Sequence, residues 1–208
     1  ASTKPFGFLP HYPGPGIGGH CIPVDPYYLL EDAKKNGIKL TLVKEAGQIN
    51  ENQPHKVVYR AVEIISTSLK KGLIRSGHNH RNGFFSAIAR VKNSAIHLKD
   101  SKKPKVLLIG VAYKPDIDDF RESPALKIWE IFEEMGYVVS YHDPYIPAFN
   151  GFSSVELSEE VVGENDLLVI TTNHSTIDYE WLIHFNKPIL DTRNVLLGSQ
   201  NTSHVFAL

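Results

Sequence analysis

The chain has 208 residues, which suits one large domain or two small ones, and its 22 basic and 23 acidic residues give a net charge of -1. This balance gives no reason to expect nucleic acid or an anionic membrane surface as a partner, and the longest apolar runs, such as 106-VLLIGVA-112, are too short to span a bilayer. The single cysteine, Cys21, cannot form an internal disulfide, so we expect a reducing compartment, the cytoplasm. Without a Cys-x-x-Cys pair, a metal site would have to rest on histidine and carboxylate, and we expect none.

Residues 1–26 differ in composition from the helical segments that are expected to follow them. Residues 1–26 hold six of the thirteen prolines and five of the fifteen glycines, which indicates a rigid, turn-rich loop that folds against something. A first helix is expected to start with Tyr28 and Leu29 and to end at Asn36-Gly37. A second helix is expected from about Ile49 to Lys71, because apolar residues recur there at spacings of three and four; they are Val57, Val58, Ala61, Ile64, Ile65 and Leu69.

Residues 76–103 are rich in Lys, Arg and His and separate two well-patterned regions, so we interpret them as a basic linker or surface insertion. Beyond them, strands alternate with helices. Strands are expected at 105–112, 137–143, 166–172 and 187–193, a helix after Ser123-Pro124 that ends at Gly136, and short helices near 156–162 and 178–184. This alternation predicts a doubly wound, Rossmann-like parallel sheet in residues 104–208.

Ligands of such sheets bind beyond the carboxyl ends of the strands, where the loop 113-YKPDIDDFRESPA-125 places Lys114 and Arg121. Both side chains suit phosphate. No Gly-x-Gly-x-x-Gly follows the first strand, so this domain is not expected to bind a dinucleotide in the standard way. The alternative is that both cations pair with the acidic residues of the same loop, Asp116, Asp118 and Asp119.

Three motifs, 14-GPGIGGHCIPVDPYYL-29, 110-GVAYKPDIDDFRESPAL-126 and 190-LDTRN-194, resemble the UDP-glucose/GDP-mannose dehydrogenase family. Members oxidise the C6 alcohol of a nucleotide sugar twice, with NAD, to a uronic acid. The run 5-PFGFLPHYPGPGIGGHCIPVDP-26 is most similar to the bacterial-type branch that acts on UDP-N-acetylhexosamines. The likeness spans nearly the whole chain apart from the basic insertion.

The resemblance implies the domain organisation. Family members run to roughly twice this length and carry an amino-terminal NAD-binding Rossmann domain, so this chain looks like the carboxyl-terminal half, and alone it is expected to bind no NAD strongly and to turn nothing over. Residues 1–75 would form the catalytic-cysteine loop and the end of a central helical dimerisation domain, and 104–208 the nucleotide-sugar (UDP) binding domain. The family likeness implies a homodimer through the helix from Ile49 to Lys71.

The resemblance also assigns candidate roles. Cys21 matches the nucleophile that adds to the C6 aldehyde, giving a thiohemiacetal and then a thioester, and Asp25 matches the aspartate that helps water attack that thioester. Matches to the substrate-binding residues of the family are Tyr12, Gly14, Gly16, Gly18, Lys114 and Arg193, and Arg121 matches an arginine near the cofactor cleft. His20 has no matched role, and we treat it as structural.

Two classes of function stay open at this point. One is the catalytic part of an NAD-dependent nucleotide-sugar 6-dehydrogenase. The other is a stand-alone nucleotide-sugar binding or dimerisation module without chemistry, in which Cys21 would be a small buried apolar residue, as most free cysteines are. A glycine fingerprint in the reading frame upstream of Ala1 would decide for the enzyme.

Overall fold

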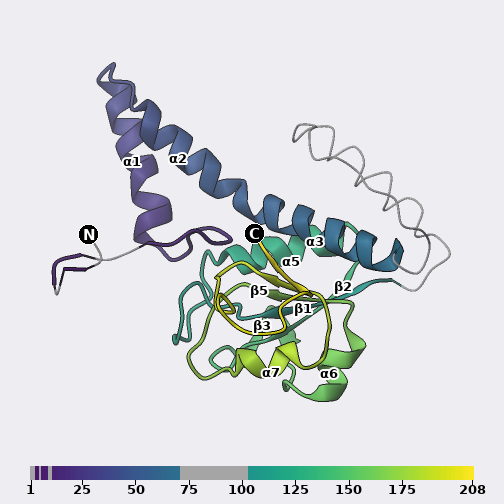
Figure 1. Ribbon diagram of the computed structural model, residues 1–208. Helices are drawn as coiled ribbons and strands as arrows, with labels where there is room; N and C mark the ends of the chain where they lie inside the picture. The colour runs from purple at the N-terminus through teal and green to yellow at the C-terminus, as the bar shows by residue number, and fades with distance from the viewer. Residues whose placement is uncertain (1–2, 5, 9–10, 71–102) are drawn as a thin grey trace.

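A five-stranded parallel sheet forms the centre of the computed structural model, which describes residues 3–4, 6–8, 11–70 and 103–208 (Figure 1). The strands lie in the order β2-β1-β5-β6-β7, with every neighbouring pair parallel. Their bounds are β1 Lys105–Ile109, β2 Val138–His142, β5 Leu167–Ile170, β6 Ile189–Asp191 and β7 Val205–Ala207. The predicted doubly wound α/β domain is confirmed; the last strand, β7, was not predicted.

Helices cover both faces of this sheet, because successive strand residues point to opposite sides. On one face, α3 (Gln53–Lys70) and α5 (Pro124–Glu134) pack on Val106, Leu108 and Val169. On the other face, α6 (Glu159–Glu164) and α7 (Tyr179–Ile183) pack on Leu107 and Ile109. A small antiparallel hairpin of β3 (Ala148–Phe149) and β4 (Phe152–Ser153), which the sequence pattern did not predict, follows β2.

Helix α5 shows how local signals set the element bounds. The Ser123 hydroxyl accepts a hydrogen bond from the backbone N–H of Ala125, 3.3 Å away, and Pro124 occupies the first turn, where its missing N–H costs nothing. The helix ends before Gly136, whose φ of +83° suits glycine. The predicted core residues Ala125, Ile128, Trp129 and Phe132 are buried, and Met135 packs against them.

Three helices of the described residues precede the sheet domain: α1 (Cys21–Lys35), α2 (Thr41–Glu51) and α3. Of these, α1 and α2 project away from the sheet as a hairpin (Figure 1). The expected loop to residue 26 is wrong, because α1 begins at Cys21. Pro23 lies in the first turn of α1, where backbone N–H groups have no helical partner and proline is tolerated. The high proline content of residues 1–26 therefore did not indicate a loop throughout. The predicted end at Asn36-Gly37 is confirmed. The second predicted helix is in fact two, since α2 ends at Glu51 and α3 starts at Gln53.

The apolar stripe of α3 is buried within its own chain. Val57, Val58, Ala61, Ile64 and Ile65 join the core cluster that contains α5 and one face of the sheet. The stripe therefore does not offer the surface through which a homodimer was expected to form. The side chain of Leu69, and the predicted basic linker 76–103 apart from Lys103, lie outside what the structure describes.

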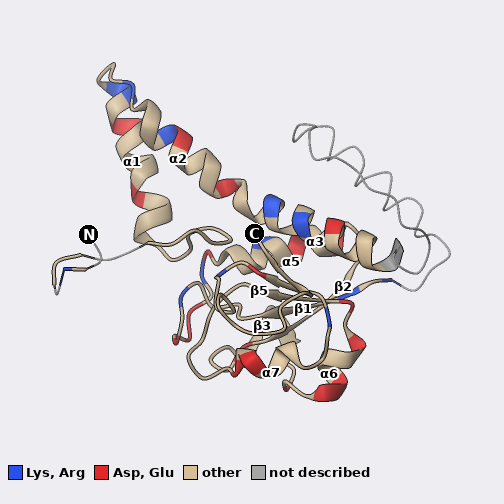
Figure 2. Cartoon of the chain, in the orientation of Figure 1, with Lys and Arg blue, Asp and Glu red and all other residues tan. Residues whose placement is uncertain are grey.

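Charged side chains of both signs are spread over α1 to α3, whereas α6 and α7 carry acidic ones (Figure 2). No helix among the described residues combines the length and the apolar character that crossing a membrane requires.

Gly110, directly after β1, lies where the backbones of two loops come closest. Its φ is +85°, and a Cβ there would lie 2.6 Å from Cβ of Thr172 and would overlap the Thr172 carbonyl oxygen. Gly136 has nearly the same φ, +83°, but open space around it. Substitutions at Gly110 and Gly136 therefore separate the energetic cost of the backbone conformation from the cost of crowding.

We expect Gly136→Ala to lower the free energy of unfolding by about 1–2 kcal/mol, the cost of a left-handed conformation. Gly110→Ala should cost about 2–5 kcal/mol, because overpacking is added to that conformational cost. Urea unfolding of the two variants measures the difference, and equal losses would contradict the close approach of the two loops.

Candidate functional site

The strand order identifies the edge at which a ligand would bind. The order β2-β1-β5-β6-β7 follows the flavodoxin-like pattern, in which the chain turns to opposite sides at the first strand and the next one beside it, here β1 and β5. The loops after these two strands are joined by hydroxyl groups: Thr172 Oγ1 donates to the Ala112 carbonyl at 2.6 Å, and Thr171 Oγ1 donates to the Gly110 carbonyl. These bonds fill the base of the crevice, so a ligand would lie further out on the loops.

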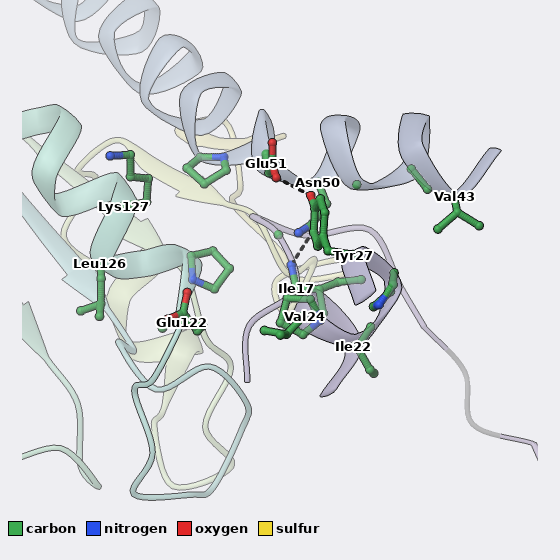
Figure 3. Close-up of a pocket in the computed structure, with 18 of the residues that line it drawn as sticks. Ile17, Ile22, Val24, Tyr27, Val43, Asn50, Glu51, Glu122, Leu126 and Lys127 are labelled. Carbon is green, nitrogen blue, oxygen red and sulfur yellow. Dashed lines mark hydrogen bonds between the residues drawn. The ribbon is translucent and has the colours of Figure 1, made fainter. Parts of the chain in front are cut away.

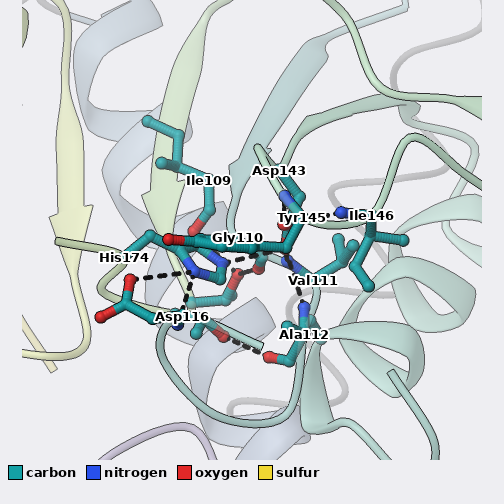
Figure 4. Close-up of polar contacts among 12 residues, drawn as sticks. Ile109, Gly110, Val111, Ala112, Asp116, Asp143, Tyr145, Ile146 and His174 are labelled. Carbon is teal, nitrogen blue, oxygen red and sulfur yellow. Dashed lines mark hydrogen bonds and ion pairs between the residues drawn. The ribbon is translucent and has the colours of Figure 1, made fainter. Parts of the chain in front are cut away.

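A buried carboxylate organises the same edge (Figure 4). Asp143, at the end of β2, is 2% exposed and accepts hydrogen bonds from five N–H groups. Oδ2 accepts from the backbone of Val111 (2.6 Å) and Ala112 (2.9 Å) and from His174 Nε2 (3.0 Å), and Oδ1 accepts from the backbone of residues 145 and 146. Burial raises the pKa of Asp143, but these hydrogen bonds outweigh it and hold the pKa below its usual value.

This arrangement does not fit a dinucleotide. In NAD-binding Rossmann domains, an acidic residue about twenty residues after the glycine fingerprint hydrogen-bonds the ribose. In this domain the carboxylate after β2, Asp143, is buried and fully engaged, and no glycine fingerprint follows β1. The described residues therefore lack the two features by which a standard Rossmann domain holds its dinucleotide. None of their His, Cys, Asp and Glu side chains form a group that could hold a metal ion.

The glycine-rich loop before α1 packs directly on this edge of the sheet. A Cβ at Gly18 would lie 2.6 Å from Cβ of Tyr113 and 2.7 Å from the Glu122 carbonyl oxygen, and a Cβ at Gly14 would overlap the Arg193 guanidinium. The Gly19 N–H donates to the Arg121 carbonyl at 3.2 Å. Glycine is needed here because the loop lies too close to its neighbours for side chains.

The same loop is tied to the helical segment. The Ile17 N–H donates to Asn50 Oδ1 on α2 at 2.7 Å. Residues 14–19 thus join the helices to the loops after β1 and β6, and the predicted substrate residues Gly14, Gly16 and Gly18 all belong to this junction.

Cys21 and Asp25 follow this junction on α1. Both side chains are exposed, and a spacing of four residues places them one turn apart on the same side of the helix. Cys21 is the first residue of the helix, the end that favours negative charge. The interpretation of Cys21 as a buried small residue is wrong for this structure.

The candidate cations differ in how firmly they are held. Arg121 pairs with Asp119 through two nitrogens, the shortest contact being Nη2 to Oδ2 at 2.7 Å, and this pair lowers the pKa of Asp119. Arg193 is partly buried and its Nε donates to Asn173 Oδ1 at 3.2 Å; burial lowers its pKa, an effect that Asp191 opposes. Lys114 and Tyr12 are exposed.

A groove of about 890 Å³ lies between α1, α2 and the start of α5 (Figure 3). Its lining is mainly apolar and includes Ile22, Val24 and Leu126. Tyr27 on its wall donates a hydrogen bond to Glu51, which raises the pKa of Tyr27. Gly16 lines this groove, whereas Cys21, Lys114 and Arg193 do not.

Two models of one family match this chain. The UDP binding domain of the UDP-glucose/GDP-mannose dehydrogenase family matches residues 107–198, and the central domain of that family matches residues 1–52. Together the two matches cover more than half of the chain. This chain belongs to the UDP-glucose/GDP-mannose dehydrogenase family.

Individual relatives agree with the family models. A UDP-N-acetyl-D-mannosamine dehydrogenase from Pyrococcus horikoshii is 31% identical over 191 residues, covering 89% of this chain and 37% of the relative. One from Methanococcus maripaludis is 28% identical over 192 residues, with 88% and 36% covered. A solved UDP-D-ManNAc dehydrogenase from Pyrococcus horikoshii aligns with 100% of this chain and 42% of its own, at a TM-score of 0.63 and 27% identity. The chain spans little more than a third of the length of its curated relatives.

Several residues at this edge of the dehydrogenase fold were not found by sequence reasoning. Tyr113 and Asn50 hold the glycine loop, and Asp143 and His174 hold the loop after β1. One signal was available: a carboxylate directly after a strand lies at the edge where ligands bind. No sequence pattern indicated His174, because its pairing with Asp143 joins two loops 31 residues apart.

Proposed function

We propose that this chain carries the nucleophile and the nucleotide-binding surface of an NAD-dependent UDP-sugar 6-dehydrogenase, acting on a UDP-N-acetylhexosamine. The observation that carries the proposal is the docking of the glycine loop, which leads directly into Cys21, on Tyr113 and Arg193 of the UDP binding domain. The names of its relatives, UDP-N-acetyl-D-mannosamine dehydrogenases, support the sugar class.

In this proposal, Lys114 and Arg193 bind the diphosphate, and the glycine loop with Tyr12 lies along the rest of the substrate. The absence of side chains at residues 14, 16 and 18 lets the loop backbone lie directly against Arg193, Pro124 and Tyr113. Residues 1–75 and 104–208 act as the two parts of one site. NAD, which we propose as the acceptor of the hydrides, would bind outside the described residues; Arg121, held by Asp119, would face it.

The proposed roles of Cys21 and Asp25 follow from the chemistry of an aldehyde. Its carbon must become tetrahedral before it can lose a hydride, and addition of the Cys21 Sγ provides this as a thiohemiacetal. Loss of hydride leaves a thioester on Sγ. Asp25, one turn along the helix, accepts a proton from the water that attacks the thioester, and the Cys21 thiol leaves. A binding module without catalytic activity would not need the exposed Cys21 and Asp25 side chains on one side of α1.

Binding of UDP to the purified chain tests the nucleotide site. We expect Lys114→Gln and Arg193→Gln each to weaken UDP binding by about 10- to 100-fold, the usual effect of losing a hydrogen bond to a charged group. Lys44→Gln, an exposed lysine on α2, is the matched control. Isothermal titration calorimetry measures the affinities. Absence of saturable UDP binding, or an equal loss in Lys44→Gln, would overturn this part of the proposal.

In the complete enzyme, Asp25→Asn should slow thioester hydrolysis by about 10²–10⁴-fold, the range of a general base. A sugar-nucleotide mass should then be found on the Cys21 peptide by mass spectrometry after quenching. Cys21→Ser should retain part of the first oxidation and nearly lose the second, because serine is a poorer nucleophile and a poorer leaving group. Two-step turnover at the wild-type rate in Cys21→Ser would remove Cys21 from the mechanism.

A homodimer is the assembly that we propose, through the α1–α2 hairpin rather than the α3 stripe. Apolar side chains exposed on the hairpin support this; they are Tyr28, Leu29, Ile38, Leu42 and Ile49. Sedimentation velocity at micromolar concentration should show a dimer that Leu42→Glu shifts to a monomer. Leu197→Glu, on the sheet domain, is the matched control because Leu197 is 85% exposed and Leu42 is 86% exposed. A wild-type monomer would refute the dimer.

A further inference from the structure

His174 is a fully buried histidine whose two ring nitrogens are both engaged (Figure 4). Nε2 lies 3.0 Å from Asp143 Oδ2, and Nδ1 lies 3.0 Å from the backbone nitrogen of Asp116. A backbone N–H can only donate, so Nδ1 is the acceptor and the proton is on Nε2, where it is donated to the carboxylate. The ring also packs against Tyr145, with centroids 5.0 Å apart.

His174 therefore joins the loops after three strands. It extends from the loop after β5, donates to Asp143 at the end of β2, and accepts from Asp116 in the loop after β1. Close to the strands, backbone hydrogen bonds of Gly110, Thr171 and Thr172 join these loops. Further out, the imidazole of His174 cross-links the loops on both sides of β1.

Asp116, which donates its N–H to this cross-link, has an uncommon backbone conformation. Asp116 has a φ of +61°, a left-handed conformation that residues other than glycine seldom adopt. His174 accepts its N–H, and the Ser175 N–H donates to its carboxylate at 2.8 Å. Two successive residues of the β5 loop thus hold Asp116 in this conformation.

Lys114 lies two residues before Asp116, with only Pro115 between them. Proline fixes its own φ, so the direction of the chain at Lys114 depends on how Asp116 is held. We propose that His174 is a positioning residue for nucleotide binding, which acts through Asp116 to present Lys114 to the diphosphate. This inference rests on the proposed function of Lys114.

Two substitutions separate the two hydrogen bonds. In His174→Asn, the amide oxygen occupies the place of Nδ1 and can still accept from Asp116. In His174→Gln, the amide nitrogen occupies the place of Nε2 and can still donate to Asp143, but the Asp116 N–H loses its acceptor. His184→Gln, at an exposed histidine after α7, is the control.

UDP titrations of the purified chain decide the role. We expect His174→Gln to weaken UDP binding by about tenfold and His174→Asn by less than about threefold. In a Lys114→Gln background, His174→Gln should change UDP affinity by less than about twofold, because its effect passes through Lys114. Additive losses, or an equal loss in the Asn and Gln variants, would overturn the proposal.

A second measurement does not depend on any variant folding. The ¹⁵N chemical shifts of the wild-type imidazole should show the tautomer protonated at Nε2, and the opposite tautomer would overturn the proposal. If the wild-type chain binds no UDP, the proposed nucleotide site itself is refuted. If the wild type binds UDP and His174→Gln binds it equally well, the nucleotide site stands and only the positioning role is refuted.

Discussion

The carboxylate of Asp143 holds the ligand-binding edge of this domain together. Five N–H groups from three loops converge on its two oxygens, and it lies in an almost water-free environment. A buried charge is tolerated only when its hydrogen-bonding capacity is satisfied, so every loop that donates to it must adopt one shape. Two of these hydrogen bonds come from Val111 and Ala112, at the start of the loop that carries Lys114. The shape of the candidate phosphate site therefore depends on Asp143, which is not itself a proposed ligand-binding residue.

Close approach of the glycine-loop backbone to a few side chains and to the Glu122 carbonyl then connects this edge to the helix that bears the cysteine. The glycine loop packs on Tyr113 and on the Arg193 guanidinium, and one hydrogen bond from Ile17 to Asn50 anchors it to α2. Cys21 follows two residues after Gly19, which bonds the Arg121 carbonyl. The position of Cys21, the proposed nucleophile, relative to the sheet is thus set within a few residues of chain. In the proposed dehydrogenase reaction, such short connections would restrict the distance between the reacting carbon and the diphosphate.

Sequence patterns predicted the parts of this fold that depend on local signals. The Ser123-Pro124 start of α5, its buried residues and its end at Gly136 could all be read directly, and so could the strands β1, β2, β5 and β6. The clearest of these is β5, which is continuously apolar, as a buried parallel strand is. The start of α1 could not, since prolines in a first helical turn resemble those of a loop. The pairs that bring distant segments together, Gly14 with Arg193 and Asp143 with His174, could not either. They depend on tertiary contacts that no periodicity encodes.

The contact between Gly14 and Arg193 also restricts how this protein can vary. The two positions are 179 residues apart in sequence, yet the guanidinium fills the space that a side chain at position 14 would need. A larger residue at position 14 therefore requires the Arg193 guanidinium to move from this place, or a smaller residue at position 193. A chimaera that takes its sheet domain from one relative and its glycine loop from another keeps this contact when both positions come from the same relative. The boundary at which parts of such enzymes can be recombined is consequently not the connection between the two segments but the surface on which they meet.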